Sequence, residues 1–347
     1  MSPPSHPESD NARILRQALV AMGGIGLAVL LWQLHQLLLV LFAAMLVAMM
    51  LHDFGHLLQR RLRLPFALAL PLAVILPLVF LTIVFGLFGT LMFQQFVGLS
   101  EQFPAAVARL EAWLRSTAPG REVIAEVQKF APSMSQVLGI AQSALGGLGS
   151  ALTDLAVVLV AAVFIAAQPR LYVDGVIGLL SEARAERTRE TFQAVRTALT
   201  GWLKAQSIGM AFVAVGTTAG LSLIGLPSAL AIGLVAGLCE FVPYLGVVVV
   251  TVPTVVLAFG QDVQTGWLTI LVLVVVQQLQ GNVVMPIAQR SFGDLPPVLT
   301  IFSLIAAGML LGPLGVILAV PLTVVGMALL RIRLHRLGRT SPLTGDT

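Results

Sequence analysis

One acidic residue stands deep within an apolar stretch of the sequence, where a charge is hardest to accommodate. Glu240 lies between Cys239 and Phe241 and three residues before Pro243. Since an ionised carboxylate is costly inside a membrane, such residues usually face a cavity and mark the path of an ion or a substrate. The alternative is a glutamate at a helix end whose side chain reaches the membrane surface. We favour the first interpretation, which makes Glu240 a candidate binding residue for a proton or a sodium ion.

Four amide side chains form a second polar cluster in an apolar stretch. They are Gln277, Gln278, Gln280 and Asn282, within 264–288 and followed by Pro286. On a helix, Gln278 and Asn282 share one face because they are four residues apart, while Gln277 and Gln280 line an adjacent face. Amides can exchange hydrogen bonds with a polar, uncharged solute without burying a charge. Hydrogen bonds that only hold a helical bundle together are the alternative, and the break at Pro286 favours binding.

Two broken apolar segments would have to position these groups. Residues 226–256 and 295–325 align without gaps, and both are long, apolar and interrupted in the middle. Paired interrupted helices at corresponding positions are the best sequence indication of a transporter's binding site, with chance similarity of two apolar helices as the alternative. The interruptions add six residues to the candidate substrate or ion site: Pro243, Tyr244 and Gly246, then Gly312, Pro313 and Gly315.

The composition excludes an ordinary soluble protein. Hydrophobic residues make up 57% of the 347 residues and charged residues 10%, against roughly half and a quarter in soluble domains. The formal charge of +4 comes from basic residues that flank the apolar stretches, as in cytoplasmic loops of membrane proteins. We therefore predict an all-α polytopic membrane protein, a helical bundle whose partner is the lipid bilayer and not nucleic acid.

Other motifs give little reason to expect an enzyme. His52 and His56 are four residues apart beside Asp53 at the edge of an apolar stretch, without an HExxH pattern, so a polar interfacial face is favoured over zinc. Cys239 is the only cysteine, which excludes an intrachain disulfide. The sequence holds no P-loop, nucleophile elbow or Rossmann fingerprint. We expect no catalytic residue, no metal site, no cofactor and no ATP-driven transport by this chain alone.

Candidate membrane spans follow from the length of apolar stretches, since a spanning helix needs about 20 apolar residues. They lie near 17–34, 36–51, 65–93, 150–168, 205–225 and 264–288. A tight hairpin is expected at 32–36 because so few residues separate the first two spans, with one overlong helix as the alternative.

The predicted organisation alternates membrane and water-exposed parts. It comprises N-terminal spans (1–93), a helical extracytoplasmic insert of balanced charge (94–148), a span (149–168), a cytoplasmic helical loop with charge pairs (169–204), a transmembrane transport region (205–332) and a basic cytoplasmic tail (333–347). Both termini are placed in the cytoplasm.

Two topologies are open for the last third of the chain. If each broken segment crosses the membrane once, the loop at 261–265 is inside and Arg290 outside; if each is a re-entrant hairpin, they exchange sides. Arg290 suits the cytoplasm, and a straight helix over 228–259 would run about 48 Å against a core of about 30 Å. We favour hairpins that enter from opposite faces.

Three sequence blocks resemble the autoinducer-2 exporter family, the PerM-type permeases. They are EFVPYLG at 240–246, QQLQGNVVMP at 277–286 and LGPLGVILAVPL at 311–322. The resemblance implies a bacterial inner-membrane protein linked to export of small signalling molecules, with some members acting as cation/proton antiporters. It also implies a homo-oligomer, with a pentamer as the suggested number, and an elevator-like moving part. Where many relatives carry an acid in the amide motif this chain has Gln280, which leaves Glu240 as the main proton-carrier candidate.

Three functions are weighed, in this order. The first is a secondary transporter that exports a small polar organic solute held between the broken segments and the amides. The second is a monovalent cation/proton antiporter that uses Glu240. The third is a membrane scaffold whose outer insert, 94–148, docks a partner.

Overall fold

The part of the chain that the computed structural model describes is almost entirely helical, without a strand. It covers residues 8–79, 82, 112, 115–116, 148–243, 245–289 and 296–337. The helices are α1 (Glu8–Gln33), α2 (His35–Leu62), an unlabelled helix (Phe66–Val79), α6 (Leu148–Ala167), α7 (Pro169–Ile177), α8 (Glu182–Leu223), α9 (Ala229–Cys239), α10 (Leu245–Gln261), α11 (Val263–Leu279), a π-helical turn (Gln280–Val284), α12 (Met285–Gln289) and α13 (Pro297–Arg336).

Several of these helices are long and apolar enough to cross a membrane. Among the described residues there are 4 such helices, or up to 5 if α6 and α7, which meet at a bend of 85°, count as one span. Together with the absence of strands from the described ranges, this confirms the predicted all-α polytopic membrane fold. The outer insert 94–148, apart from Ala112, Arg115, Ser116 and Leu148, lies outside those ranges, as do Arg290 and the tail after residue 337.

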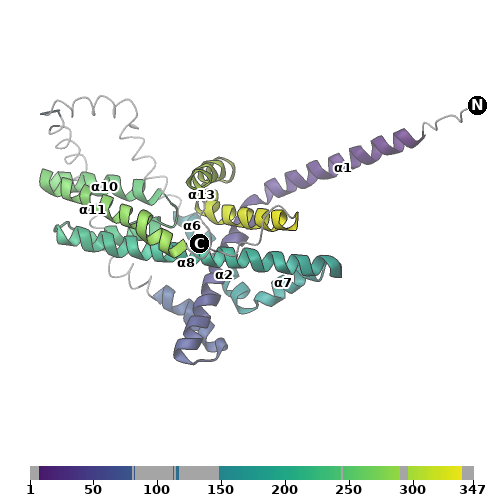
Figure 1. Cartoon of the computed structure of the whole chain (residues 1–347), viewed down its shortest axis with the longest axis horizontal. Coiled ribbons are helices and arrows are strands. Elements are labelled where there is room, and N and C mark those ends of the chain that lie inside the picture. Colours follow the sequence, from purple (N-terminus) through teal and green to yellow (C-terminus); the bar gives the residue numbers. More distant parts are fainter. Residues whose placement is uncertain are drawn as a thin grey trace, which may run out of the picture.

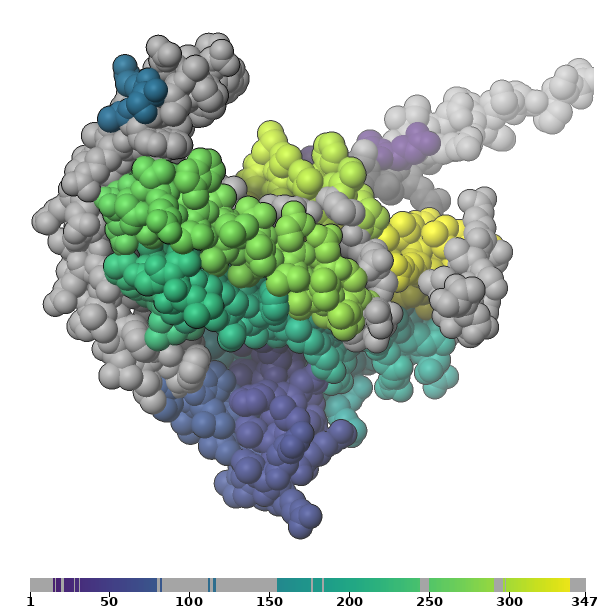
Figure 2. All heavy atoms as spheres, turned by 60° about the vertical axis from the view of Figure 1, so that its left-hand side comes forward, coloured from purple at the N-terminus to yellow at the C-terminus, as the bar shows by residue number. Residues whose placement is uncertain are grey.

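Helix α8 is the central element of the bundle. It runs for 42 residues, about 60 Å at 1.5 Å per residue, so its charged first half and its apolar second half form one continuous rod. Helices α9, α11, α12 and α13 all pack against it. Figure 1 shows α8 along the length of the molecule, and Figure 2 shows α10 and α11, in green, lying over the teal surface of α8.

The junction between α1 and α2 differs from the expected hairpin. Only Leu34 separates the two helices, and the main-chain N–H of Leu34 donates to Leu30 while that of Leu38 donates to Leu34. The helical hydrogen-bond pattern therefore continues through the junction, and α1 projects away from the bundle in Figure 1. The tight hairpin at 32–36 is wrong, because no Gly or Pro is present there to reverse the chain; the chain instead bends at Leu34, whose φ is −91° and ψ 0°, between two separate helices.

Both repeat segments are broken where the sequence indicates. In the first, α9 ends at Cys239, residues 240–243 form turns and α10 begins at Leu245. In the second, α13 is interrupted at Gly312, whose φ of 69° and ψ of −158° belong to a region that essentially only glycine adopts. The two parts of α13 run in different directions in Figure 1. Gly312 is the residue that aligns with Pro243, so the interruptions occupy equivalent positions.

Small residues allow α9 to pack closely on α8. A Cβ atom added to Gly233 would lie 2.0 Å from Thr218 Oγ1, and one added to Gly237 would lie 2.6 Å from Ala214 Cβ. This glycine pair, spaced four apart, is the small-residue pattern that lets membrane helices approach each other. The contact fixes the end of α9, and with it Glu240, against the middle of the bundle.

Candidate functional site

Glu240 caps the end of α9 and is buried within the protein. Its side chain is 5% exposed, and its main-chain N–H donates to the carbonyl oxygens of Ala236 and Leu238. The carboxyl group therefore does not reach the protein surface. A buried carboxylate requires compensating hydrogen bonds, and the neighbouring helices supply them.

Gln280 supplies the main hydrogen bond to the buried carboxyl group. Its Nε2 atom donates to Glu240 Oε1 over 3.1 Å, and the Gln280 side chain is itself buried. The amide of Gln277, on the same face of α11, is the next polar group beside the carboxyl. Glu240 Oε2 is buried and receives no hydrogen bond of good geometry from the described residues. This oxygen remains available to a ligand, a proton or a cation.

Gln206 of α8 joins this cluster, and sequence reasoning missed it. The side chain is 2% exposed, and Nε2 donates to the main-chain carbonyl oxygen of Glu240. It thereby satisfies one of the carbonyl groups that a helix end leaves without a partner. The available signal was one amide in an apolar stretch, but Lys204 lies two residues earlier, so the pattern is also typical of a water-exposed span end.

The amide motif contains a π-helical turn. Over Gln280–Val284 the helix widens, and the main-chain N–H of Met285 donates to the carbonyl oxygen of Gln280. Such turns are rare and are frequent at functional sites. Pro286 follows directly and has no N–H to donate, but the helix continues past it to Gln289, so the break expected at Pro286 is instead a widening of the helix over the turn before it. A Cβ atom on Gly209 would lie 3.4 Å from Gln280 Nε2, so α8 closes the other side of the cluster.

The other two amides face away from Glu240. Asn282 Nδ2 donates to Gln278 Oε1 over 2.6 Å, and both side chains are exposed. The motif is thus divided as the spacing predicts, with Gln277 and Gln280 on the inner face and Gln278 and Asn282 on the outer face. The structure brings only the inner pair to the carboxyl group.

The two breaks lie against one apolar cluster. Phe241 follows Glu240 in the first break, and Leu311 and Leu314 flank the second; all three pack against a core built by α2, α8 and α13. The ring of Phe241 meets Trp202 edge to face at a centroid distance of 5.6 Å. The structure therefore brings the two interruptions to the same region of the bundle.

The remaining candidate residues occupy the turns themselves. Pro243 lies in the turn between α9 and α10 and is half-buried, whereas Tyr244 is outside the described residues. Gly246 lies in the first turn of α10 and Pro313 begins the second part of α13. A Cβ atom on Gly315 would lie 2.4 Å from the carbonyl oxygen of Ala307, so this glycine allows the two parts of α13 to approach closely.

Comparison with known proteins covers nearly the whole chain. The family described as AI-2E family transporter matches residues 21–333. A Bacillus subtilis protein named "Putative transport protein YueF" is 32% identical over 154 residues, 44% of this chain and 42% of that protein. Another from the same organism, "Putative transport protein YrrI", is 33% identical over 112 residues, 32% of each chain. A Thermotoga maritima "Putative transport protein" is 24% identical over 246 residues, 70% of this chain and 75% of its own length. The chain thus matches less than half the length of the two Bacillus relatives.

Proposed function

This chain belongs to the AI-2E transporter family, and from that premise we propose that it is a secondary transporter of a small polar organic solute. We place it in the bacterial inner membrane with both termini in the cytoplasm, and we propose export as the direction of flux. The resemblance suggests a solute of the autoinducer-2 kind. A homo-oligomer, with the pentamer as the suggested number, and an elevator-like moving part belong to the same proposal.

One observation carries the site: the buried carboxyl of Glu240 meets the amide of Gln280 at a break in the helix. An ionisable group at membrane depth usually marks a substrate or ion path. Broken helices are tolerated at that depth only where the backbone is buried in protein or lines a cavity. A hydroxyl group of the solute could donate to Glu240 Oε2, which accepts no hydrogen bond of good geometry from the part of the chain that the structure describes. The Gln277 amide beside it could then donate to or accept from a second polar atom.

We also propose that the two broken segments are re-entrant hairpins. Each is interrupted at the equivalent position, and the residues at both interruptions pack against one apolar cluster. Hairpins that enter from opposite faces would meet in this way near the middle of the bilayer. The solute would then be held between the turns at 240–246 and 312–315, with the amides of α11 and its π-helical turn beside it.

Transport into liposomes that contain the purified protein tests the solute site. Purified full-length protein in liposomes should accumulate a polyhydroxylated autoinducer-2-like probe, and Gln277→Ala with Gln280→Ala should reduce the initial rate at least tenfold. Gln278→Ala with Asn282→Ala is the matched comparison, because it removes two amides from the outer face of the same helix. A smaller loss is expected there. Undiminished transport by the inner double variant would remove Gln277 and Gln280 from the mechanism.

The second candidate function, monovalent cation/proton antiport, is favoured by Glu240 Oε2. A carboxyl oxygen that is buried without a strong partner can take up a proton or a cation in turn. In this case a sodium gradient should drive proton movement, detected with a pH-sensitive dye, in liposomes that contain the protein but no organic solute. Glu240→Gln should abolish that signal because an amide cannot exchange the proton. Solute flux without any such signal would favour the first function.

The scaffold function stays third. Its docking module would be the insert 94–148, which is largely outside the described residues. Deleting residues 100–140 separates the alternatives: a transporter would retain flux, whereas a scaffold would lose its partner.

A further inference from the structure

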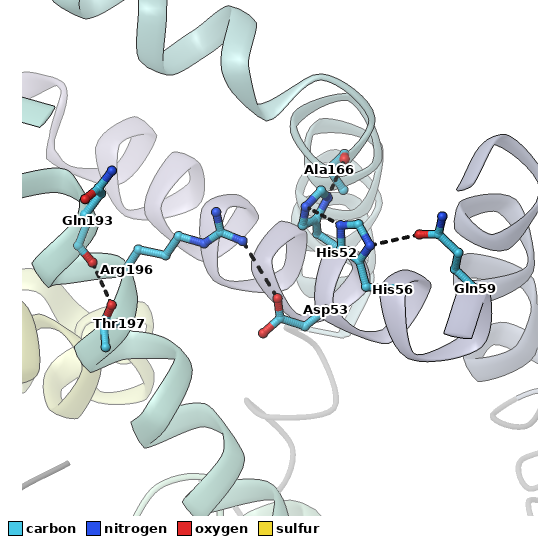
Figure 3. A network of polar contacts seen from close by, with 8 residues as sticks. All are labelled: His52, Asp53, His56, Gln59, Ala166, Gln193, Arg196 and Thr197. Atoms are coloured by element: carbon cyan, nitrogen blue, oxygen red, sulfur yellow. Dashed lines mark hydrogen bonds and ion pairs between the residues drawn. The ribbon is translucent and has the colours of Figure 1, made fainter. Parts of the chain in front are cut away.

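We infer that His52 and His56 form a binding site for a divalent transition-metal ion, of the class of Ni²⁺, Cu²⁺ and Zn²⁺. The two residues lie one turn apart near the end of α2, away from Glu240 and its amides. Figure 3 shows their rings between Ala166 of α6 and Gln59 of α2. The inference is independent of the transported solute.

The hydrogen bonds on the far side of each ring determine which nitrogen atoms are free. His52 Nδ1 lies 3.2 Å from the carbonyl oxygen of Ala166, and His56 Nδ1 lies 3.0 Å from Gln59 Oε1. A carbonyl oxygen only accepts hydrogen bonds, so His52 Nδ1 carries the proton, and with Gln59 Oε1 facing the other ring His56 Nδ1 carries it as well. In a neutral imidazole the other nitrogen, Nε2, then presents a lone pair.

These two lone pairs face each other. His52 Nε2 and His56 Nε2 are 3.1 Å apart, a distance at which two acceptors repel unless a cation lies between them. Two nitrogen ligands bound to one metal ion at about 2.0–2.1 Å are separated by roughly 2.9 Å in square-planar and 3.3 Å in tetrahedral geometry. The observed separation lies within that interval. Imidazole nitrogen is also the ligand that Zn²⁺, Cu²⁺ and Ni²⁺ share.

The surroundings resemble the outer shell of known metal-binding histidines, which donate their second N–H to a carbonyl or carboxylate group. Phe66 holds the pair from a neighbouring helix, since its ring stacks on His56 at 4.7 Å and meets His52 edge to face at 5.2 Å. His56 is exposed, which gives an ion access from solvent. Asp53 is paired at 3.9 Å with Arg196 of α8, so the Asp53 carboxylate partly offsets the positive charge of the Arg196 guanidinium near the two rings.

The protein offers two ligands here, and water would complete the coordination. Among the described residues no group of three or more His, Cys, Asp or Glu side chains is arranged to hold a metal ion. An open two-imidazole site is accordingly expected to bind reversibly. The sequence alone favoured a polar interfacial face at these positions; the orientation of the four ring nitrogen atoms points to a cation instead.

Titration with NiCl₂ tests the site. Full-length protein in detergent, purified with a tag that contains no histidine and then treated with chelator, should bind one Ni²⁺ per protomer by isothermal titration calorimetry. His56→Ala should weaken binding at least tenfold. His35→Ala is the matched control, because it removes a histidine of the same helix that has no second imidazole one turn away, and it should leave the affinity unchanged.

Two further variants keep the test decisive. Gln59→Glu replaces the amide by a group that can only accept, so the proton stays on His56 Nδ1 and Ni²⁺ affinity should be retained or increased. Cu²⁺ added to the same protein should give an electron paramagnetic resonance spectrum with two coupled imidazole nitrogen atoms, reduced to one in His56→Ala. Affinity that is unchanged in His56→Ala would overturn the site. Absence of Ni²⁺ binding by the unmodified protein would overturn it as well.

Discussion

Gln280 holds the carboxyl group of Glu240 from a position 40 residues further along the chain. The contact joins the first broken segment to the π-helical turn that precedes the second. Gln206 of α8 donates a further hydrogen bond to the main-chain carbonyl oxygen of Glu240. Three elements that are separate in sequence therefore meet at Glu240, α8 at its main-chain carbonyl and the π-helical turn at its carboxyl group, and most of the proposed transport chemistry depends on this meeting.

Removing the Gln280 amide should destabilise the protein. In Gln280→Leu the Glu240 carboxyl group loses its hydrogen bond, and leaving a buried polar group without its partner costs about 1–3 kcal/mol. Thermal unfolding in detergent, followed by circular dichroism, measures this loss. Gln278→Leu, on the exposed face, should change stability by less than about 0.5 kcal/mol. The double variant Glu240→Leu with Gln280→Leu should recover much of the lost stability; a double variant as unstable as the two single changes added together would argue against their coupling.

Gly312→Ala should destabilise the break in α13. The φ of 69° and ψ of −158° at this position cost a residue with a side chain about 1–3 kcal/mol, and open space around the Cβ position cannot relieve a backbone conflict. Gly326→Ala is the control on the same helix, where an added Cβ meets nothing within 4 Å and should be neutral or stabilising by about 0.4–1 kcal/mol. Equal unfolding temperatures for the two variants would contradict the kink.

Gly237→Ala should separate α9 from α8. The added Cβ would lie 2.6 Å from Ala214 Cβ and 2.7 Å from the carbonyl oxygen of Met210, and such overpacking costs about 1–3 kcal/mol. Because α9 carries Glu240, transport should fall together with stability. Gly26→Ala, where nothing lies within 4 Å of the added atom, serves as the control. Full transport activity in Gly237→Ala would show that the α8–α9 contact tolerates a shift.

The turn between α10 and α11 should be sensitive to acid. Asp262 caps α11, and hydrogen bonds from the side chain and main chain of Thr265 lower the pKa of its carboxyl group. A lowered pKa in the folded state contributes stability above the unfolded pKa, near 4, and this contribution is lost as pH falls through the folded value. Asp262→Asn, which keeps a capping oxygen, should remove that part of the pH dependence. Hydrogen exchange of α11 between pH 3 and pH 6 measures it, and identical profiles would contradict the cap.

Cysteine labelling should distinguish re-entrant hairpins from simple crossings. In a Cys239→Ala background, an impermeant maleimide should label Asp262→Cys from outside the cell and Arg290→Cys only from the cytoplasmic side. Crossing segments predict the reverse for both positions. In both topologies the two positions lie on opposite sides of the membrane. Labelling of both positions from the same side would therefore exclude both topologies.

Local patterns in the sequence predicted much of the architecture. Apolar stretches of spanning length indicated a helical membrane protein, because the bilayer fixes how long such stretches must be. The interruptions at Pro243 and Gly312 could be located because Pro and Gly act on the backbone of their own positions. The division of the amides into two faces followed from the helical period alone. At 32–36 the same reasoning failed, since a short separation was taken for a hairpin where no turn residue was present.

What the sequence could not determine is which polar groups meet. Gln206 and Gln280 reach Glu240 from 34 and 40 residues away, and that encounter depends on how α9 packs on α8 through Gly237 and how the amide motif packs on α8 beside Gly209. The helical period gives the faces of a helix but not the neighbour that each face meets. The sequence by itself therefore determined the membrane class, the breaks and the candidate polar residues. Only the tertiary structure decided that the carboxyl is buried against the inner amides, because contacts between helices depend on the packing of side chains far apart in the chain.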